Sequence, residues 1–192
     1  VDIFLQLGFD GIHYNIEPIF SGDENIIDLL KRTHTITKAN GKILSIASDE
    51  IEPFPFADKL IRIFAKRAGF WNKEYYLQVA DNVDQVAVMM YDTAIPFAWL
   101  YGYVVKWQVE KITTAIGGKV LLFIGVPTYE EERWSFHANA ENMFSGIRGI
   151  SMGIEEIPLD ILQDKFGVAI YSEWTTDDAE WKTYRTEWLL NY

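Results

Sequence analysis

Short apolar runs alternate with longer amphipathic stretches along the whole chain. Five runs have the composition of strands, and they cover residues 11–17, 42–48, 85–91, 119–125 and 167–172. Their starts lie 31, 43, 34 and 48 residues apart. Each gap is long enough to hold a helix, so the spacing predicts parallel strands joined by helical crossovers.

Helix signals occur between the predicted strands. Ser21 followed by Glu24 has the form of a capping box and predicts a helix start, and Asn40-Gly41 predicts the end of that helix. Apolar residues at helical spacing predict further helices over residues 57–68, 75–82, 99–116, 139–149 and 178–190. Repeated alternation of strand and helix predicts an α/β protein with a parallel sheet.

The residue pattern of the first strand distinguishes between two architectures that contain a parallel sheet. It places His13, Asn15 and Glu17 on one face, and the residues between them on the other face are apolar or aromatic. A doubly wound sheet buries both faces of its central strands, whereas a barrel presents polar groups at the mouth formed by its strand ends. The pattern therefore predicts a (β/α)8 TIM barrel.

Five strand–helix units are fewer than such a barrel requires. A barrel of this kind needs roughly 250 residues, and this chain has 192. We therefore expect residues 1–192 to be a single domain that supplies the last five βα units, the fourth to the eighth strand, as the C-terminal part of a longer protein. Otherwise self-association or another partner has to cover the open sheet edges.

Composition narrows the possible partners. The net charge of −11 disfavours nucleic acid, and no apolar run is long enough for a membrane span. The absence of cysteine excludes disulfides and thiolate chemistry, and the three histidines share no metal-ligand spacing, so no metal is expected. Aromatic residues reach 15%. Together with the excess of carboxylates they fit a sugar-stacking cleft, although most of the rings are expected in the core.

The most informative segment is the octapeptide DGIHYNIE at residues 10–17. Alternation along a strand points His13, Asn15 and Glu17 toward one cavity. A carboxylic acid at a partly desolvated barrel mouth can act as a general acid, and the Asn15 amide can hydrogen-bond the group that Glu17 protonates. A buried polar cluster without a catalytic role would give the same pattern.

Four segments resemble motifs of glycoside hydrolase family 18, the chitinase-like barrels, in the order of that family. Residues 10–17 resemble its Asp-Gly-x-Asp-x-Asp-x-Glu signature on the fourth strand. The other three segments are VMMYD at 88–92, GVPTY at 125–129 and GVAIYS at 167–172, which resemble the motifs of the sixth, seventh and eighth strands.

The resemblance implies a retaining, substrate-assisted glycosidase that acts on β-linked N-acetylglucosamine glycans and needs no cofactor. Glu17 is then the acid and base, Tyr91 holds the acetamido group of the substrate, and Asn15 orients it. Substrate binding is expected from Asp92, Met89, Tyr171, His13 and Tyr129, with Tyr171 as the floor beneath the reacting sugar. An extracellular or cell-surface location is favoured by the same resemblance.

Three positions depart from the family pattern. His13 and Asn15 replace aspartates, and Tyr171 replaces the usual tryptophan. Related enzymes of glycoside hydrolase family 85 use an Asn-x-Glu pair for the same chemistry, so Asn15 remains compatible with activity. A protonated His13 would favour the carboxylate form of Glu17, and a working enzyme should therefore keep this histidine neutral.

Two alternatives remain open. One is a non-catalytic, lectin-like barrel of the same family. The other is a two-carboxylate glycosidase, which would pair Glu17 with a glutamate from residues 130–132, a segment expected to be a solvated loop. Rim positions for the sugar are also undecided: Trp99, Tyr101, Tyr103, Glu173 and Trp174 are candidates either for the cleft or for simple packing.

Overall fold

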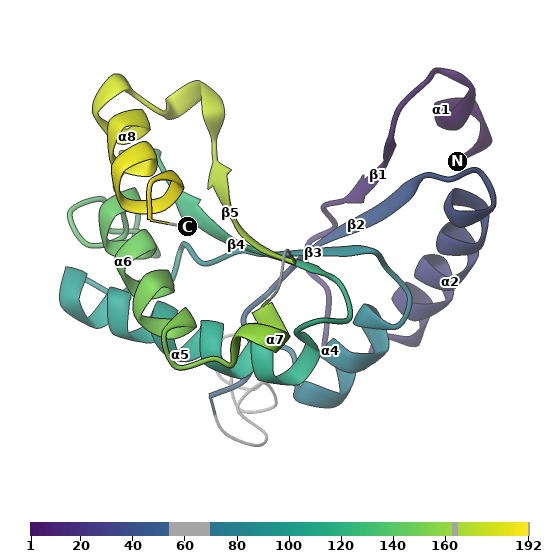
Figure 1. Ribbon diagram of the computed structural model, residues 1–192, viewed down its shortest axis with the longest axis horizontal. Coiled ribbons are helices and arrows are strands. Elements are labelled where there is room, and N and C mark those ends of the chain that lie inside the picture. The colour runs from purple at the N-terminus through teal and green to yellow at the C-terminus, as the bar shows by residue number, and fades with distance from the viewer. Residues whose placement is uncertain (54–69, 163–164, 192) are drawn as a thin grey trace.

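Five parallel strands form one curved sheet in the computed structural model, which describes residues 1–53, 70–162 and 165–191 (Figure 1). The strand order follows the sequence, with each strand hydrogen-bonded to the next. The strands are β1 (Gly11–Tyr14), β2 (Ile43–Ser48), β3 (Gln85–Val88), β4 (Leu121–Pro127) and β5 (Phe166–Tyr171). The prediction of an α/β protein with a parallel sheet is confirmed.

The main helices lie on the convex side of the sheet, and its concave side is left open (Figure 1). Their bounds are α1 (Asp2–Gln6), α2 (Glu24–Ala39), α4 (Lys73–Ala80), α5 (Ala98–Ile116), α6 (Met143–Ile154), α7 (Leu159–Leu162) and α8 (Asp178–Thr183). A 3-10 turn covers Glu173–Thr175, and a π-helical segment, Tyr184–Leu189, continues α8. None of the helices in the described ranges is long and apolar enough to cross a membrane.

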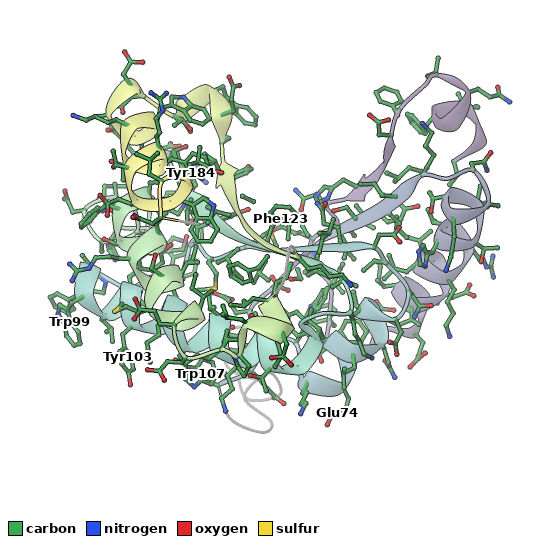
Figure 2. All side chains as sticks on the ribbon, in the orientation of Figure 1. Glu74, Trp99, Tyr103, Trp107, Phe123 and Tyr184 are labelled. Carbon is green, nitrogen blue, oxygen red and sulfur yellow. The ribbon has the colours of Figure 1, made fainter. Side chains whose placement is uncertain are left out.

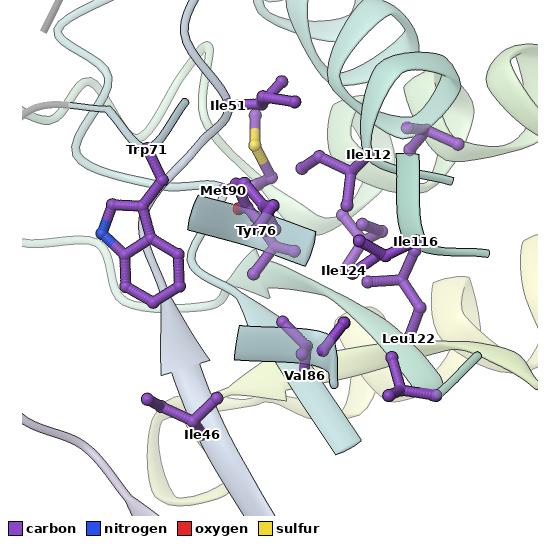
Figure 3. Packing of buried hydrophobic residues seen from close by; sticks show 14 of the residues in the cluster. Ile46, Ile51, Trp71, Tyr76, Val86, Met90, Ile112, Ile116, Leu122 and Ile124 are labelled. Atoms are coloured by element: carbon purple, nitrogen blue, oxygen red, sulfur yellow. The ribbon is translucent and has the colours of Figure 1, made fainter. Parts of the chain in front are cut away.

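The core lies between the convex face of the sheet and the helices (Figure 3). Alternate strand residues such as Ile46, Val86 and Ile124 point to this side and are fully buried. Helices α5 and α6 pack closely because glycines face the contact. A Cβ atom at Gly153 would come within 2.8 Å of the Val109 Cβ, so a side chain there would force the two helices apart.

Several predicted helix boundaries are corrected by the structure. The N-cap of α2 is Asp23, whose carboxylate accepts the N–H of Asn25, while the Ser21 hydroxyl accepts the N–H of Asn72 on another segment. The capping box assigned to Ser21 is therefore wrong. The helix expected over 139–149 begins at Met143, because Asn142 caps it.

Three other helix predictions can be compared with the structure, and a fourth cannot. The end of α2 at Asn40 and the extent of α5 are confirmed, and the helix expected over 75–82 covers Lys73–Ala80. The predicted helix over 57–68 lies outside the described residues.

The concave face and the two outer strands show where further strands could extend this sheet. Within the described residues β1 pairs only with β2, and β5 pairs only with β4, so each leaves an outer edge open. Phe123 projects from β4 on the open side (Figure 2) and is only partly buried. An open edge and exposed apolar groups fit a sheet that closes with further strands. Closure into an eight-stranded barrel stays a prediction.

Candidate active site

A cleft of about 690 Å³ opens beyond the carboxyl ends of the strands. The strands are parallel, so the segments that follow all five of them meet at this one end of the sheet. Its lining comprises Asn15, Glu17, Pro18, Asp49, Glu50, Met89, Tyr91, Asp92, Tyr129, Glu131, Arg133, Ser135, Tyr171, Ser172, Trp174 and Thr175. All but one of the predicted catalytic and binding residues, Glu17, Asn15, Tyr91, Asp92, Met89, Tyr171 and Tyr129, are therefore in one place.

His13 is the predicted site residue that does not line this cleft. Its ring Nδ1 lies 2.8 Å from the Ser45 hydroxyl, and the Gln85 side-chain amide donates to that same hydroxyl at 2.9 Å. Ser45 has a single hydroxyl hydrogen, so accepting from Gln85 leaves it free to donate to a neutral imidazole. Partial removal of the ring from water lowers the pKa of His13. The hydrogen bonds permit, and the lowered pKa favours, the neutral histidine that a general acid at Glu17 requires.

Three tyrosines pack together at the ends of β3, β4 and β5. The rings of Tyr91 and Tyr171 stack, and the ring of Tyr129 stands edge-on to both, with centroids 6.2 Å and 6.1 Å away. Burial raises the pKa of the Tyr91 hydroxyl, and neighbouring Tyr171, Glu17 and Asp92 raise it further. Tyr91 therefore keeps its proton at neutral pH and can donate a hydrogen bond into the cleft.

Asp92 occupies a turn with an unusual backbone. Its φ is 59° and that of Ala94 is 60°, both in the left-handed region that residues with a Cβ rarely adopt. Asp92 Oδ1 and the Tyr129 hydroxyl are buried and make no hydrogen bond to another described residue. Burial raises the pKa of Tyr129, and the nearby Asp92 raises it further. Because both atoms are shielded from the cleft, small shifts of neighbouring protein groups or an ordered water are needed to pair them.

The loop after β4 brings an ion pair to the cleft. Arg133 and Glu131 both line it, and their side chains are joined at 2.6 Å. This contact holds the pKa of Glu131 below its ordinary value. Glu131 is thus a carboxylate already occupied by arginine, which is a poor starting point for a nucleophile.

Three acidic residues near the site were missed by sequence reasoning. Asp49 and Glu50 follow β2 directly and line the cleft, a position at the end of a predicted strand that would have been a usable signal. Glu141 is 1% exposed and accepts the N–H of Thr93, next to Asp92, at 3.0 Å. Nothing in the local sequence around Glu141, which falls in the helix predicted over 139–149, distinguishes it from a solvated residue.

Of the five residues considered for the rim of the sugar site, one lines the cleft and four do not. Trp174 lines the cleft and Glu173 does not. Trp99 and Tyr103 lie on the outer side of α5, 73% and 61% exposed, and belong to no part of the cleft (Figure 2). Tyr101 is buried, and its hydroxyl donates to the Met90 carbonyl at 2.6 Å. No group of three potential metal ligands occurs in the described part of the chain.

The lining therefore combines aromatic faces, neutral phenols and carboxyl groups. Aromatic faces stack against apolar faces of sugar rings, while carboxyl groups accept hydroxyl and amide hydrogens. Glu17 lines the cleft and is exposed, so its carboxyl group can exchange protons with a ligand and with water. Such a cleft suits an uncharged, hydrogen-bonding ring compound and disfavours a polyanion.

Known proteins resemble this chain in structure only. No protein-family model matches the sequence, and no curated protein matches it. A chitinase from Chromobacterium violaceum ATCC 12472 superposes with a TM-score of 0.66 at 16% identity, over 97% of this chain and 68% of that chain. Because nearly the whole chain superposes, its fold is that of the matching part of this chitinase, and the prediction of a chitinase-like fold is confirmed.

Two insect structures match over shorter stretches. The group IV chitinase of Ostrinia furnacalis has a TM-score of 0.43 at 22% identity, over 66% of this chain and 38% of that chain. Catalytic domain 2 of the group II chitinase from the same insect has a TM-score of 0.41 at 20% identity, over 66% and 36%. The matching part thus spans little more than a third of each insect structure.

Proposed function

We propose that this chitinase-fold chain carries the active site of a family 18-type glycoside hydrolase. In this proposal the complete enzyme is an eight-stranded barrel, and this chain supplies five of its eight strand–helix units. Its substrates are glycans with β-linked N-acetylglucosamine, and cleavage retains the anomeric configuration. One observation carries the proposal. Glu17 follows β1, and Tyr91 and Asp92 follow β3, yet these residues, distant in sequence, line one cleft in which the Glu17 charge raises the pKa of the Tyr91 hydroxyl.

The proposed reaction has two steps. Glu17 donates its proton to the glycosidic oxygen as the bond from the anomeric carbon to that oxygen breaks, and the acetamido oxygen of the same sugar bonds to this carbon. An oxazolinium ion results. The Glu17 carboxylate then takes a proton from water, whose oxygen attacks the anomeric carbon. This attack breaks the bond from that carbon to the acetamido oxygen and so opens the oxazolinium ring. Glu17 ends the cycle protonated, as it began.

The other residues position the acetamido group. The neutral Tyr91 hydroxyl donates to the acetamido carbonyl, and its raised pKa preserves that donor. The side-chain carbonyl of Asn15 can accept the acetamido N–H. A neutral amide, however, adds no negative charge to offset the positive charge of the oxazolinium ion. Asp92 and Tyr129 line the wall of the cleft and can supply further contacts with the sugar.

Tyr171 and Met89 complete the proposed sugar site. Both line the cleft. One face of Tyr171 is covered by Tyr91, and 43% of its surface remains exposed for a sugar ring. His13, joined to Ser45 below the cleft, supports the site from the strands and is not proposed to contact the substrate directly.

A non-catalytic glycan-binding barrel is the second candidate. The observation in its favour is chemical: positions 13 and 15 hold histidine and asparagine instead of carboxylates, so the charge that would stabilise the oxazolinium is reduced. The presence of Glu17 at the cleft favours the enzyme. A two-carboxylate glycosidase is less well supported, since Glu131, the carboxylate of the 130–132 segment that lines the cleft, is paired with Arg133.

Hydrolysis of a chromogenic chitobioside by the full-length protein tests the proposal. Glu17→Gln should lose essentially all turnover but still bind the sugar, because the amide keeps the shape of the side chain and cannot donate the acid proton. Asn15→Asp should retain or increase turnover. A thiazoline mimic of the oxazolinium should inhibit competitively. Binding without turnover in every variant would establish the lectin-like alternative, and turnover that survives Glu17→Gln would refute the assigned acid.

A further inference from the structure

A buried carboxyl group lies behind the cleft. Glu141 precedes α6, is 1% exposed, and is not among the residues that line the cleft. It belongs to none of the four motifs, and no step of the proposed reaction uses it. No ion pair to Glu141 occurs in the described part of the chain. A carboxyl group buried without a cation is costly, and its place therefore needs an explanation.

The direct contact of Glu141 is with the turn that carries Asp92. Glu141 Oε2 accepts the backbone N–H of Thr93 at 3.0 Å, and the Ser135 carbonyl accepts the N–H of Ala94 at 2.8 Å. The loop after β4 thus holds this turn at two successive amides. The turn needs such support, because the residues on both sides of Thr93 have left-handed φ angles.

The second oxygen of Glu141 belongs to a group of unpaired atoms. Glu141 Oε1, Asp92 Oδ1, Thr93 Oγ1 and the Tyr129 hydroxyl are all buried, and none makes a hydrogen bond of good geometry within the described residues. The Thr93 side chain is nevertheless close enough to Glu141, and Asp92 close enough to the Tyr129 hydroxyl, to shift the pKa of Glu141 and of Tyr129. The Asp92 charge acts on both Glu141 and Tyr129, so these groups lie near one another. Buried polar atoms are nearly always paired, which indicates that small rearrangements or an ordered water join them.

We propose that Glu141 is a positioning residue for Asp92. It fixes the backbone of the Asp92 turn through Thr93, and through Oε1 it completes the hydrogen bonds behind the Asp92 carboxylate and the Tyr129 hydroxyl, so that both face the sugar. Protonated Glu141 is the form that can do this, because it offers a hydrogen to neighbours that include a carboxylate. This inference rests on the proposed glycan site and adds a residue that determines its affinity.

A double-mutant cycle tests whether Glu141 acts through Asp92. The affinity of the full-length protein for tri-N-acetylchitotriose is measured in the turnover-deficient Glu17→Gln background. Glu141→Leu should weaken binding about tenfold, yet by less than twofold when Asp92→Ala is also present. Glu141→Gln should bind nearly as well as the parent, because the amide keeps an acceptor for Thr93 and a donor for Asp92. Equal losses with and without Asp92 would overturn the proposal.

Further variants keep the test decisive. If the leucine variant fails to fold, Glu141→Asp, which withdraws the carboxyl by one methylene, takes its place in the cycle with the same expectation. Glu132→Leu is the matched control: Glu132 is exposed, lies in the same loop, and accepts the N–H of Ala138 at 2.9 Å, so its loss should leave sugar affinity unchanged. A tenfold loss in this control as well would refute a specific role for Glu141.

Amide hydrogen exchange separates this inference from the proposed function. In the protein without sugar, Glu141→Leu should speed exchange at the Thr93 amide at least tenfold, and Glu141→Gln should leave it slow. If no variant binds the sugar but this pattern holds, the glycan function fails and the support of the turn stands. If Thr93 exchange is the same in all variants, the proposed positioning role is wrong whether or not sugar binds.

Discussion

The rings of Tyr91 and Tyr171 stack with their centroids 4.9 Å apart and their planes at 11°, although the strands that lead to them are not neighbours. Strand β4 lies between them and contributes Gly125 to this side of the sheet. A Cβ atom at Gly125 would lie 3.2 Å from Cε1 of Tyr91 and 2.8 Å from the carbonyl oxygen of Val88. The missing side chain therefore leaves room for the two rings to meet.

Gly125→Val should disturb this stack. The new side chain would collide with backbone and with Tyr91, so the free energy of unfolding should fall by about 1–3 kcal/mol and sugar affinity should weaken. Urea titrations and calorimetric binding measure the two effects. Gly102→Ala, whose Cβ would meet only the Ser145 carbonyl at 3.3 Å, serves as the control and should cost less. Unchanged stability and affinity in Gly125→Val would contradict the steric argument.

Tyr91→Phe should separate the hydroxyl from the ring. The stack with Tyr171 is kept, so the urea midpoint should stay near that of the parent, while loss of the donor to the acetamido carbonyl should lower kcat about 10²–10³-fold. Hydrolysis of the chromogenic chitobioside gives kcat and KM separately. Tyr103→Phe on the outer face of α5 is the control and should change neither. Normal kcat in Tyr91→Phe would remove this hydroxyl from the mechanism.

Glu131→Gln tests the two-carboxylate alternative. Glu131 is exposed and paired with Arg133, and exposed ion pairs contribute little to stability. Removing its charge should change kcat by less than about threefold, because the acetamido group of the substrate is the nucleophile in the proposed reaction. The steady-state rate is compared with that of Glu17→Gln under the same conditions. A loss comparable to that of Glu17→Gln, restored by added azide, would identify Glu131 as a nucleophile.

Glu141 should make stability depend on pH in a predictable direction. Burial raises its pKa in the folded protein, and the nearby Asp92 adds to the shift. Above the ordinary value of 4.5, the unfolded chain loses this proton while the folded protein still holds it. The free energy of unfolding therefore falls as pH rises from about 4.5 to the raised folded pKa, and this contribution is constant above that pKa.

Urea midpoints of the parent and Glu141→Gln across pH 4 to 8 measure this contribution. Glutamine cannot titrate, so the difference between the two proteins isolates Glu141 from the other carboxyl groups. The parent should lose stability relative to the glutamine variant as pH rises through that window. Parallel curves at every pH would mean that Glu141 titrates in the folded protein as it does in the unfolded chain.

Much of the candidate site could be predicted because it depends on local order. Residues that follow parallel strands meet at one edge of a sheet, so alternation along the first strand predicted that Glu17 faces the cavity, while Tyr91 and Asp92 were assigned to the same site through their resemblance to family 18 motifs. Helix ends were less predictable. Ser21 and Asp23 are both good caps in sequence, and the choice between them depended on Asn72, about fifty residues away, whose N–H occupies the Ser21 hydroxyl.

The amino-acid sequence by itself determined the alternation of strands and helices, the parallel sheet, and the carboxyl, phenol and aromatic groups at the strand ends, since periodicity and residue type are properties of short segments. Only the tertiary structure decided that His13 is joined to Ser45 below the cleft, that Tyr91 stacks on Tyr171 across Gly125, and that Glu141 supports the Asp92 turn. These contacts join distant segments, so they depend on strand register, loop path and burial, which no short segment encodes.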